Sequence, residues 1–492
     1  MKINITNCVE NIKKKLHYGS DLKERKVQFF SRRVSLLYLA DLTDLNIVND
    51  NLLRPLMEYE GEVGKDYLDI IAKEVLSDAE VSSVETEEEA VQKILKGFTL
   101  LIVDKESKIL CVNAEKITVR AVETPPNSVV VKGPRQGFNE SLKYNLSLLR
   151  QRLATEKLAI KTMTLGRLTQ TQVAICYLNG VASKKVVNDI MKRLSKIDID
   201  GVLDSSYISN FLQKKPNSIF KQIGDTEKPD ILCAKLLEGR VGIMVDGSPI
   251  VLTLPFIILE DLQSSDDYYN QHVRISFVRL LRFVGIILAI LLPGVYVSLQ
   301  VYHYKIIPIE FLITIMNTTQ GIPFTPFTEI VFVILLFEVL YEANLRMPQY
   351  LGMALSIVGA LILGETAVNA GLVSPPAVMI VALSGLTFYV VPNQATQFSM
   401  LRLLFTLFGA VLGLFGILLG VIGVVSYLSS FDSYDSAYLG PIAPFVAKDQ
   451  KDFFIKQSER NMKLRPLSIA NNRKNLRRTK ISDKQKEKTD EN

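Results

Sequence analysis

Five apolar stretches in the C-terminal half constrain the fold of this chain more than any other feature. They span residues 283–302, 327–341, 351–369, 377–391 and 403–428. A helix needs roughly 20 apolar residues to cross about 30 Å of hydrocarbon, and the first, third and last stretches come close to that length or exceed it. The residues before 272 are rich in charge. The sequence therefore predicts a soluble N-terminal domain followed by an α-helical multi-pass membrane domain at residues 273–430.

The number of crossings depends on the second stretch. Glu329, Glu338 and Glu342 lie on or next to residues 327–341, and a charge at bilayer depth costs about 2.5–3.5 kcal/mol. This stretch is either buried in an assembly or lies in the membrane interface as an amphipathic helix. Counting it as interfacial leaves four crossings, which we favour, whereas a further span at residues 306–316 gives six.

Basic residues set the predicted orientation. Arg274, Arg279 and Arg282 flank the first stretch on its N-terminal side, and positive charge accumulates on the cytoplasmic side of membrane helices. We therefore expect the soluble domain in the cytoplasm of a bacterial cell membrane. The C-terminal tail, residues 431–492, is expected on the same side, so the number of crossings should be even.

The tail itself is predicted to be basic and disordered. Residues 461–492 hold ten basic and four acidic side chains and few apolar ones. Beside a membrane, each basic residue is attracted to anionic lipid headgroups by about 1 kcal/mol. No aromatic residues interleave with the basic ones, so the composition favours membrane lipids over nucleic acid as the partner.

The soluble part contains an internal duplication. Residues 34–39 resemble residues 173–178, and further on residues 94–104 resemble residues 236–246 in the same order. Two ordered self-matches predict a duplicated α/β domain. The predicted divisions are an N-terminal segment at 1–26, a first module at 27–130, a connecting loop and helix at 131–164 and a second module at 165–272.

Each module shows the same series of local patterns. A β-branched run is followed by a helical pattern, a second extended segment, a helix that enters a glycine (Gly97 or Gly239), and a hairpin. In the second hairpin Asp246 and Gly247 separate two apolar runs, which is a strong turn signal. The loop before the connecting helix, residues 131–139, contains glycine but neither phosphate-binding pattern, so we expect a rigid turn at the helix start.

No pattern typical of an enzyme or a metal site is found. The three histidines are isolated, the four cysteines have no CxxC spacing, and no catalytic signature is present. The cysteines are expected to be buried as small apolar residues. The sequence predicts no catalytic residue, no cofactor and no metal.

Small residues recur at every fourth position on the third apolar stretch. Gly352, Ser356, Ala360 and Gly364 form one helix face, and Glu365 and Asn369 lie beside its end. This face either packs against a neighbouring helix, which is the favoured interpretation, or lines a narrow passage between several copies of the chain. On the last stretch, glycines at GxxxG spacing, including Gly409 and Gly413, predict close helix contact.

Several unusual motifs resemble the GerA-type spore germination proteins, in particular the A subunit of the nutrient germinant receptor; SpoVAF-like paralogues are similar over the same region. The residues that carry this resemblance are Gly133, Pro134, Arg135, Gly137, Phe138, Asp246, Gly247, Ser248, Pro249, Ser374, Pro375 and Pro376, together with residues 262–269 and 344–348. The resemblance extends from about residue 25 to 445.

The resemblance implies a place in the spore inner membrane beside a transporter-like B subunit and a lipoprotein C subunit. It implies a homo-oligomer that forms or gates an ion channel and triggers germination in response to nutrients. The alternative is a non-conducting membrane scaffold that assembles germination partners through its cytosolic modules. A secondary transporter is disfavoured, because the repeat lies in the soluble part and not in the membrane part.

Overall fold

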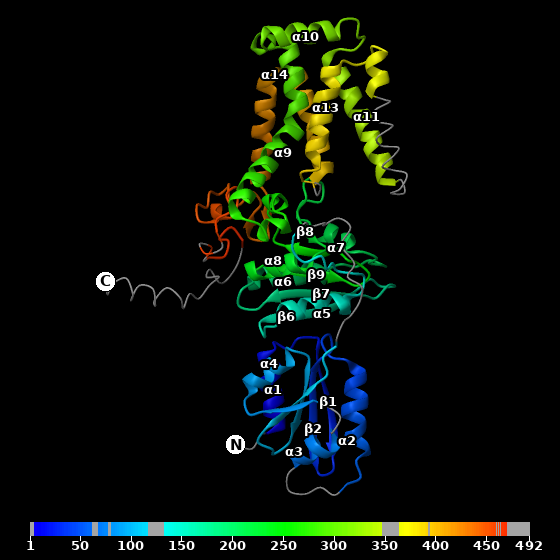
Figure 1. The fold of residues 1–492 in the computed structure, drawn as a ribbon, viewed down its shortest axis with the longest axis vertical. Coiled ribbons are helices and arrows are strands. Elements are labelled where there is room, and N and C mark those ends of the chain that lie inside the picture. The colour runs from blue at the N-terminus through cyan, green and yellow to red at the C-terminus, as the bar shows by residue number, and fades with distance from the viewer. Residues whose placement is uncertain are drawn as a thin grey trace, which may run out of the picture.

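Three parts are stacked along the long axis of the molecule, with the two α/β modules below and the apolar helices above (Figure 1). This computed structural model describes residues 4–61, 67–76, 80–116, 132–346, 364–391 and 394–458, together with 460, 462 and 464–469. The modules follow one another in the stack, so only the second one adjoins the helices.

The first module is an antiparallel sheet in the order β1-β2-β4-β5-β3, with helices on both faces. One face packs on α1 and α4, and the other packs on η1, α2 and η2. Its elements are α1 (Ile5–Lys15), β1 (Leu22–Phe29), β2 (Arg32–Leu39), η1 (Ile47–Leu53), α2 (Arg54–Glu58), α3 (Tyr67–Ile70), η2 (Ile71–Val75), β3 (Val81–Val84), α4 (Glu87–Ile94), β4 (Phe98–Val103) and β5 (Ile109–Asn113).

The second module repeats this topology as the sheet β6-β7-β9-β10-β8. Its central pair has the same register: Leu36 faces Leu101 in the first sheet, and Ile175 faces Ile243 in the second. The elements are α5 (Leu142–Arg152), β6 (Leu158–Leu165), β7 (Thr171–Leu178), α6 (Lys184–Leu194), α7 (Ser205–Leu212), β8 (Gly224–Thr226), α8 (Pro229–Glu238), β9 (Val241–Val245) and β10 (Val251–Leu254). This agrees with the predicted duplication and with both predicted hairpins.

Both modules begin earlier than the self-matches suggested. The expected connecting helix is α5, which packs with α8 in one core of the second module, and the expected N-terminal segment contains α1, whose Ile12 and Leu16 are buried in the first. The edge strands β1 and β6 complete the sheets. The edge strands and α1 are partly exposed, so they tolerate many residues and leave little similarity. Helix α5 is largely buried, so exposure does not explain its assignment outside the module.

A junction segment of two short helices, η3 (Ile258–Leu262) and η4 (Ser265–Tyr268), leads into the apolar helices. These are α9 (His272–Val301), η5 (Tyr304–Ile306), α10 (Ile309–Thr319), α11 (Pro326–Arg346), α13 (Pro375–Phe388) and α14 (Ala395–Ser429). Among the described residues, two helices, α9 and α14, are long and apolar enough to cross a membrane, and α13 is a shorter apolar helix. The structure therefore does not by itself establish how many times the chain crosses.

The two doubtful segments take different positions. α10 lies across the far end of the bundle (Figure 1), and its 11 residues extend about 17 Å, too short for a span. α11, by contrast, is not a separate interfacial helix: Ile330, Val333 and Ile334 are buried against α9 and α13. The preference for an interfacial second stretch was therefore wrong. Glu338 is paired with Arg402 and Glu329 is buried beside Ser374, whereas Glu342 is exposed.

α14 reverses direction at Gly413. That residue has φ 66° and ψ −152° in the middle of a helix that otherwise appears continuous, and a positive φ of this kind favours glycine. A Cβ on Gly420 would lie 2.8 Å from the Phe405 ring, although these residues would be about 22 Å apart in a straight helix. α14 is thus a hairpin of two arms of about 27 and 24 Å, not the single span predicted.

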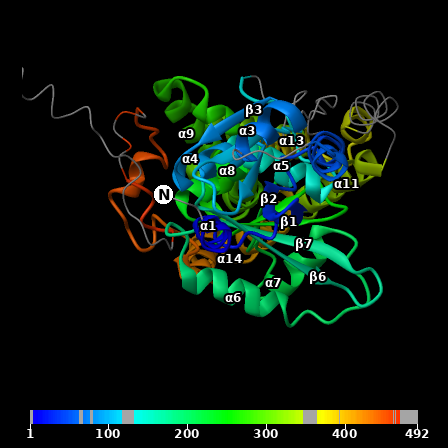
Figure 2. The same ribbon diagram turned by 90° about the horizontal axis from the view of Figure 1, so that it is seen from below.

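The segment after α14 is ordered, contrary to the prediction of a disordered tail from residue 431. It contains β11 (Asp432–Ser433), β12 (Ser436–Ala437) and η7 (Asp449–Lys451), and it lies on the side opposite α11 in both views (Figures 1 and 2). Tyr434 joins the core of the second module, and Phe431 and Tyr438 pack with Phe256. Buried aromatic side chains order this segment. Residues 470–492, which carry most of the predicted basic tail, lie outside the described residues.

Candidate functional site

The junction between the second module and α9 is held by buried ion pairs. Asp267 of η4 is fully buried and accepts hydrogen bonds from Arg279 Nε and Arg282 Nη1, both at 2.9 Å. Arg279 is 2% exposed and also donates to Asp452 Oδ1 at 2.9 Å. Three segments distant in the chain therefore meet at one carboxylate and one guanidinium. Any change in the angle of α9 has to move this cluster.

The arginines used to predict orientation thus have a structural role as well. A buried ion pair that loses one partner leaves an uncompensated charge, which costs about 3–5 kcal/mol. Lys456 Nζ additionally donates to the Asp267 backbone carbonyl. The start of α9 is consequently fixed to the soluble part by charge as well as by the chain itself.

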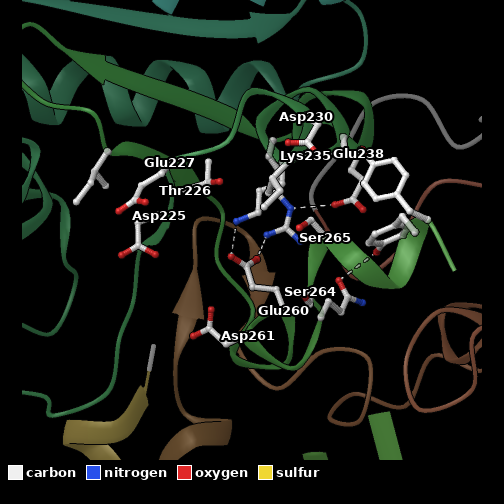
Figure 3. A pocket seen from close by; sticks show the side chains of 17 residues that line it. Asp225, Thr226, Glu227, Asp230, Lys235, Glu238, Glu260, Asp261, Ser264 and Ser265 are labelled. Atoms are coloured by element: carbon white, nitrogen blue, oxygen red, sulfur yellow. Dashed lines mark hydrogen bonds and ion pairs between the residues drawn. The ribbon is translucent and has the colours of Figure 1, made fainter. Parts of the chain in front are cut away.

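A cavity of about 500 Å³ lies next to this cluster, between α8, β8 and the junction segment. Figure 3 shows Glu260 extending from the junction segment toward Lys235 of α8. The charged residues of its wall are Asp225, Glu227, Asp230, Lys235, Glu238, Arg240, Glu260 and Asp261. The wall is predominantly acidic, which disfavours an anionic ligand.

Glu260 is the centre of the cavity wall. It accepts a hydrogen bond from Lys235 Nζ at 2.9 Å and is paired with Arg240, whose Nε also contacts Glu238 at 3.1 Å. Burial raises the pKa of Glu260, but Arg240 and Lys235 outweigh burial and hold that pKa below its usual value. Both cations of the wall are therefore already paired. The network ties α8 to η3.

The predicted motif residues of the second module come together around α5. The Asp246 Oδ1 atom accepts a hydrogen bond from the Leu142 backbone N–H at 3.0 Å, and the Gly247 N–H donates to the Glu140 carbonyl at 2.8 Å. Asp246 of the hairpin turn therefore satisfies the first backbone N–H of α5, and Asn139 of the glycine loop accepts from the N–H of the N-cap residue Ser141. Ser248 Oγ donates to Asp204 at 2.5 Å and so fastens α7 as well.

The glycine loop itself links the second module to the junction. Gly133 has φ 116°, and a Cβ there would lie 2.6 Å from the Tyr269 ring. The Lys132 N–H donates to Asp266 at 3.2 Å, and Phe138 is buried with α5. Of the remaining motif residues in this loop, Gly137 is buried, Pro134 is partly exposed and Arg135 is exposed. The loop is a structural clamp, in line with the rigid turn that was expected.

The third motif begins α13. Ser374 is the N-cap, its hydroxyl accepts from the Ala377 N–H, and Pro375 and Pro376 occupy the first turn, where no backbone donor is needed. The Ser374 N–H donates to Glu329 Oε1 at 2.5 Å. This contact places the start of α13 beside the start of α11, so the two helices run in the same direction.

An ion pair between a buried arginine and a partly exposed glutamate of the bundle was missed by the sequence reasoning. Arg402 of α14 is 1% exposed and donates to Glu338 of α11 at 2.7 Å, and its guanidinium lies 4.5 Å from the centre of the Phe388 ring. Arg402 was overlooked because it stands one residue before the last apolar stretch. Helical spacing could have indicated its burial. Arg402 follows Phe398 by four residues and precedes Phe405 by three, and so lies on an apolar stripe of the helix.

The predicted small-residue face is only partly described. Gly352, Ser356 and Ala360 lie outside the described residues, whereas Gly364, Glu365 and Asn369 belong to a helical segment at residues 364–369. Glu365 and Asn369 are exposed, and a Cβ on Gly364 would meet no atom within 4 Å. This face therefore has no neighbour within the described part of the chain.

All four cysteines are buried and unpaired, as expected for small apolar side chains. Burial raises the pKa of the Cys8 and Cys111 thiols to about 11 and that of Cys233 to about 12. These thiols are protonated at neutral pH and are poor nucleophiles. In the described ranges, no group of three or more metal-ligating side chains occurs.

Sequence comparison decides the family. The model of the Bacillus/Clostridium GerA spore germination proteins matches residues 10–468. This chain belongs to the GerA family. The resemblance drawn from the glycine loop, the Asp246 turn and the Ser374 cap is thereby confirmed.

Individual relatives cover nearly the whole chain. Spore germination protein KA of Bacillus subtilis (strain 168) is 31% identical over 95% of this chain and 87% of its own length. The uncharacterized membrane protein YfkQ of the same organism is 33% identical over 98% of this chain and 95% of its own length. The N-terminal domain of the A subunit of the Bacillus megaterium spore germinant receptor GerK3, a crystal structure, is similar over 52% of this chain and 96% of that chain, with 30% identity and a TM-score of 0.42.

Proposed function

We propose that this GerA-family chain is the multi-pass membrane subunit of a spore germinant receptor complex, and that several copies form or gate an ion-conducting channel that opens in response to nutrients. The subunit lies in the spore inner membrane with its α/β modules in the cytoplasm. A transporter-like B subunit and a lipoprotein C subunit complete the complex. No catalytic residue or cofactor is assigned to it.

A membrane environment is supported by the apolar surface of the helices. Leu386, Phe415, Val411 and Ile422 are each more than half exposed, and the two arms of α14 carry such residues along their outer faces. A continuous apolar surface of this kind is stable in lipid and unfavourable in water. The basic residues at the start of α9 support a cytoplasmic position for the modules.

The hairpin at Gly413 supports six crossings. α9, α11, α13 and the two arms of α14 supply five of them. Because Ser374 contacts Glu329 at the start of α11, α11 and α13 begin at the same end of the bundle, and the sixth crossing that we propose is the span expected from the sequence at residues 351–369. Six crossings put the module-contacting segment after residue 430 on the same side as the modules, as its packing requires.

The observation that carries the channel proposal is the exposed polar face at residues 364–369. Glu365 and Asn369 are exposed next to Gly364, whose surroundings are empty. Polar side chains next to a bilayer face either a partner chain or water. A symmetric assembly that places this face at its axis provides both, because identical helices with small residues approach closely and leave a polar passage.

The test is a bulky substitution on this face. Gly364→Leu should alter ion release from spores, either blocking the nutrient response or causing leakage without nutrient. Gly423→Leu is the matched control, because a Cβ on Gly423 also meets nothing within 4 Å, but on α14. Wild-type ion release in Gly364→Leu spores that hold normal amounts of the protein would contradict the channel.

The non-conducting scaffold remains the second candidate, and the buried junction favours it as much as it favours the channel. It predicts that Gly364→Leu leaves ion release unchanged, whereas a junction variant such as Asp267→Ala prevents assembly of the complex. Measuring both variants for ion release and for co-purification of the other subunits separates the two candidates.

A further inference from the structure

Glu329 is a buried carboxylate for which the described residues provide no counter-charge. It is 2% exposed at the start of α11, and within the described ranges no Lys, Arg or His side chain pairs with it. Its one hydrogen bond to a backbone donor comes from Ser374 at 2.5 Å. Glu338, on the same helix, is matched by Arg402 at 2.7 Å. The contrast makes Glu329 exceptional within this bundle.

Oxygen atoms without partners surround this carboxylate. The Tyr296 phenol of α9 lies close to Glu329, Ser374 and Gln300. Tyr296 is 6% exposed, and its hydroxyl and both polar atoms of the Gln300 side chain are buried. Ser374 and Gln300 lie near the hydroxyl, but none of these contacts has the distance and angle of a normal hydrogen bond. Three helices thus direct carboxylate, phenol, hydroxyl and amide groups to one place, at the end of the bundle farthest from the modules.

Such an arrangement is costly unless something binds there. Each buried polar group without a partner costs about 1–3 kcal/mol, and an unpaired buried charge costs more. A bound cation removes both costs, because it balances the carboxylate and accepts the lone pairs of the neutral oxygens.

The chemistry of the donors limits the cation. The donors are hard oxygens without a thiolate or an imidazole, which disfavours transition metals. One carboxylate balances one positive charge, whereas Ca²⁺ usually takes six to eight oxygens with several carboxylates. A monovalent alkali ion fits the charge and the donor set.

We propose that Glu329, Tyr296, Gln300 and Ser374 form a binding site for a monovalent alkali cation, Na⁺ or K⁺. The site joins α9, α11 and α13 at one end of the bundle. It requires only the folded chain and does not depend on whether the assembled protein conducts ions.

The experiment measures thermal unfolding of the full-length protein in detergent with NaCl, KCl or choline chloride at constant ionic strength. The melting temperature should rise with Na⁺ or K⁺, saturate, and stay low in choline, because a ligand that binds only the folded state stabilises it. Glu329→Gln should abolish this dependence. Glu342→Gln is the matched control on the same helix, since Glu342 is exposed and pairs only with Arg346, and it should retain the dependence.

Tyr296→Phe keeps the proposal testable if Glu329→Gln fails to fold. It removes one neutral oxygen and should raise the cation concentration needed for half-saturation about fivefold, which is the effect of one lost polar contact. Binding of radioactive rubidium to the purified protein gives an independent readout. A melting temperature that responds to pH but not to Na⁺ or K⁺ would show that the carboxyl binds a proton instead, and would overturn the site.

Discussion

The two α/β modules share one strand order but are held in the molecule in different ways. The first contacts the second through a small set of polar groups, including a 2.8 Å ion pair between Asp21 and Arg150 whose side chains are 2% and 1% exposed. The second is bound on one side to the junction cluster and on another to the segment after α14. The duplication preserved the sheet, and the surfaces diverged so that the second module connects to the apolar helices.

The divergence is concentrated where the modules differ in neighbours. In the second module, Tyr434 from the C-terminal segment completes the core around α6 and α7. In the first, the corresponding face is covered by η1, α2 and η2. We expect changes in the second module to disturb the helices, and changes in the first to remain local.

The largest expected effect comes from breaking the junction. Asp267→Ala leaves the buried Arg279 and the partly buried Arg282 without their carboxylate and should lower the free energy of unfolding by about 3–5 kcal/mol. Thermal unfolding of the purified protein, with limited proteolysis between β10 and α9, would measure it.

Asp198→Ala in the same module is its control. Asp198 pairs with Arg167 at the surface, where both side chains are more than 60% exposed, so the change should leave the free energy of unfolding nearly unchanged. Equal effects of the two substitutions would show that the junction is not the stable connection described here.

The second prediction concerns a carboxyl group that only the first module has. Burial, together with the nearby Asp21, raises the pKa of Asp41 to about 6. At the offset that relates Tyr38 to Tyr177, the second module has Gly180 at this position. Because the folded pKa lies above the unfolded one, the neutral form stabilises the fold below about pH 4, and up to about 3 kcal/mol is lost as pH rises through 6.

Hydrogen exchange of the first sheet at pH 4.5 and 7 would test this, with peptides of the second sheet as the internal reference. Asp41→Asn should remove the difference between the two pH values in the first sheet. If both sheets respond alike, or if the variant still responds, the pH sensitivity does not arise at Asp41.

The smallest expected effect tests how the segment after α14 is held to the second module. The Tyr434 hydroxyl donates to the Leu212 carbonyl at 2.7 Å inside the second core. Tyr434→Phe should cost about 1–2 kcal/mol, because it leaves a buried carbonyl unsatisfied. Tyr207→Phe on the exposed face of α7 should be neutral. A neutral result for Tyr434→Phe would indicate that the segment docks through its aromatic rings alone.

Much of the soluble fold was accessible from the sequence. The buried central strands retain enough similarity for Val34–Leu39 to match residues 173–178, and Asp246 with Gly247 marks a hairpin that the structure contains. The edge strands and helices α1 and α5 were assigned outside the modules. For the edge strands and α1 the reason is partial exposure, which tolerates many residues and leaves little similarity, whereas α5 is largely buried.

The membrane part was less accessible. Local apolarity identified the stretches, but it could not show that Gly413 turns the chain, because glycine serves equally for close helix contact and for a positive φ. Nor could it pair Glu338 with Arg402, which lie 64 residues apart on different helices. Of the acidic residues that argued against a buried helix, Glu338 is paired with Arg402 and Glu342 is exposed, whereas Glu329 is buried without a counter-charge among the described residues.

The sequence by itself determined the division into soluble and apolar halves, the duplication, the family motifs and the burial of the cysteines, because these depend on local composition and on repeated patterns. Only the tertiary structure decided where α14 reverses, that residues after 430 return to the second module, and which buried charges have partners. Those features depend on contacts between residues far apart in the chain, and the free energy of a buried charge is set by what lies beside it in space.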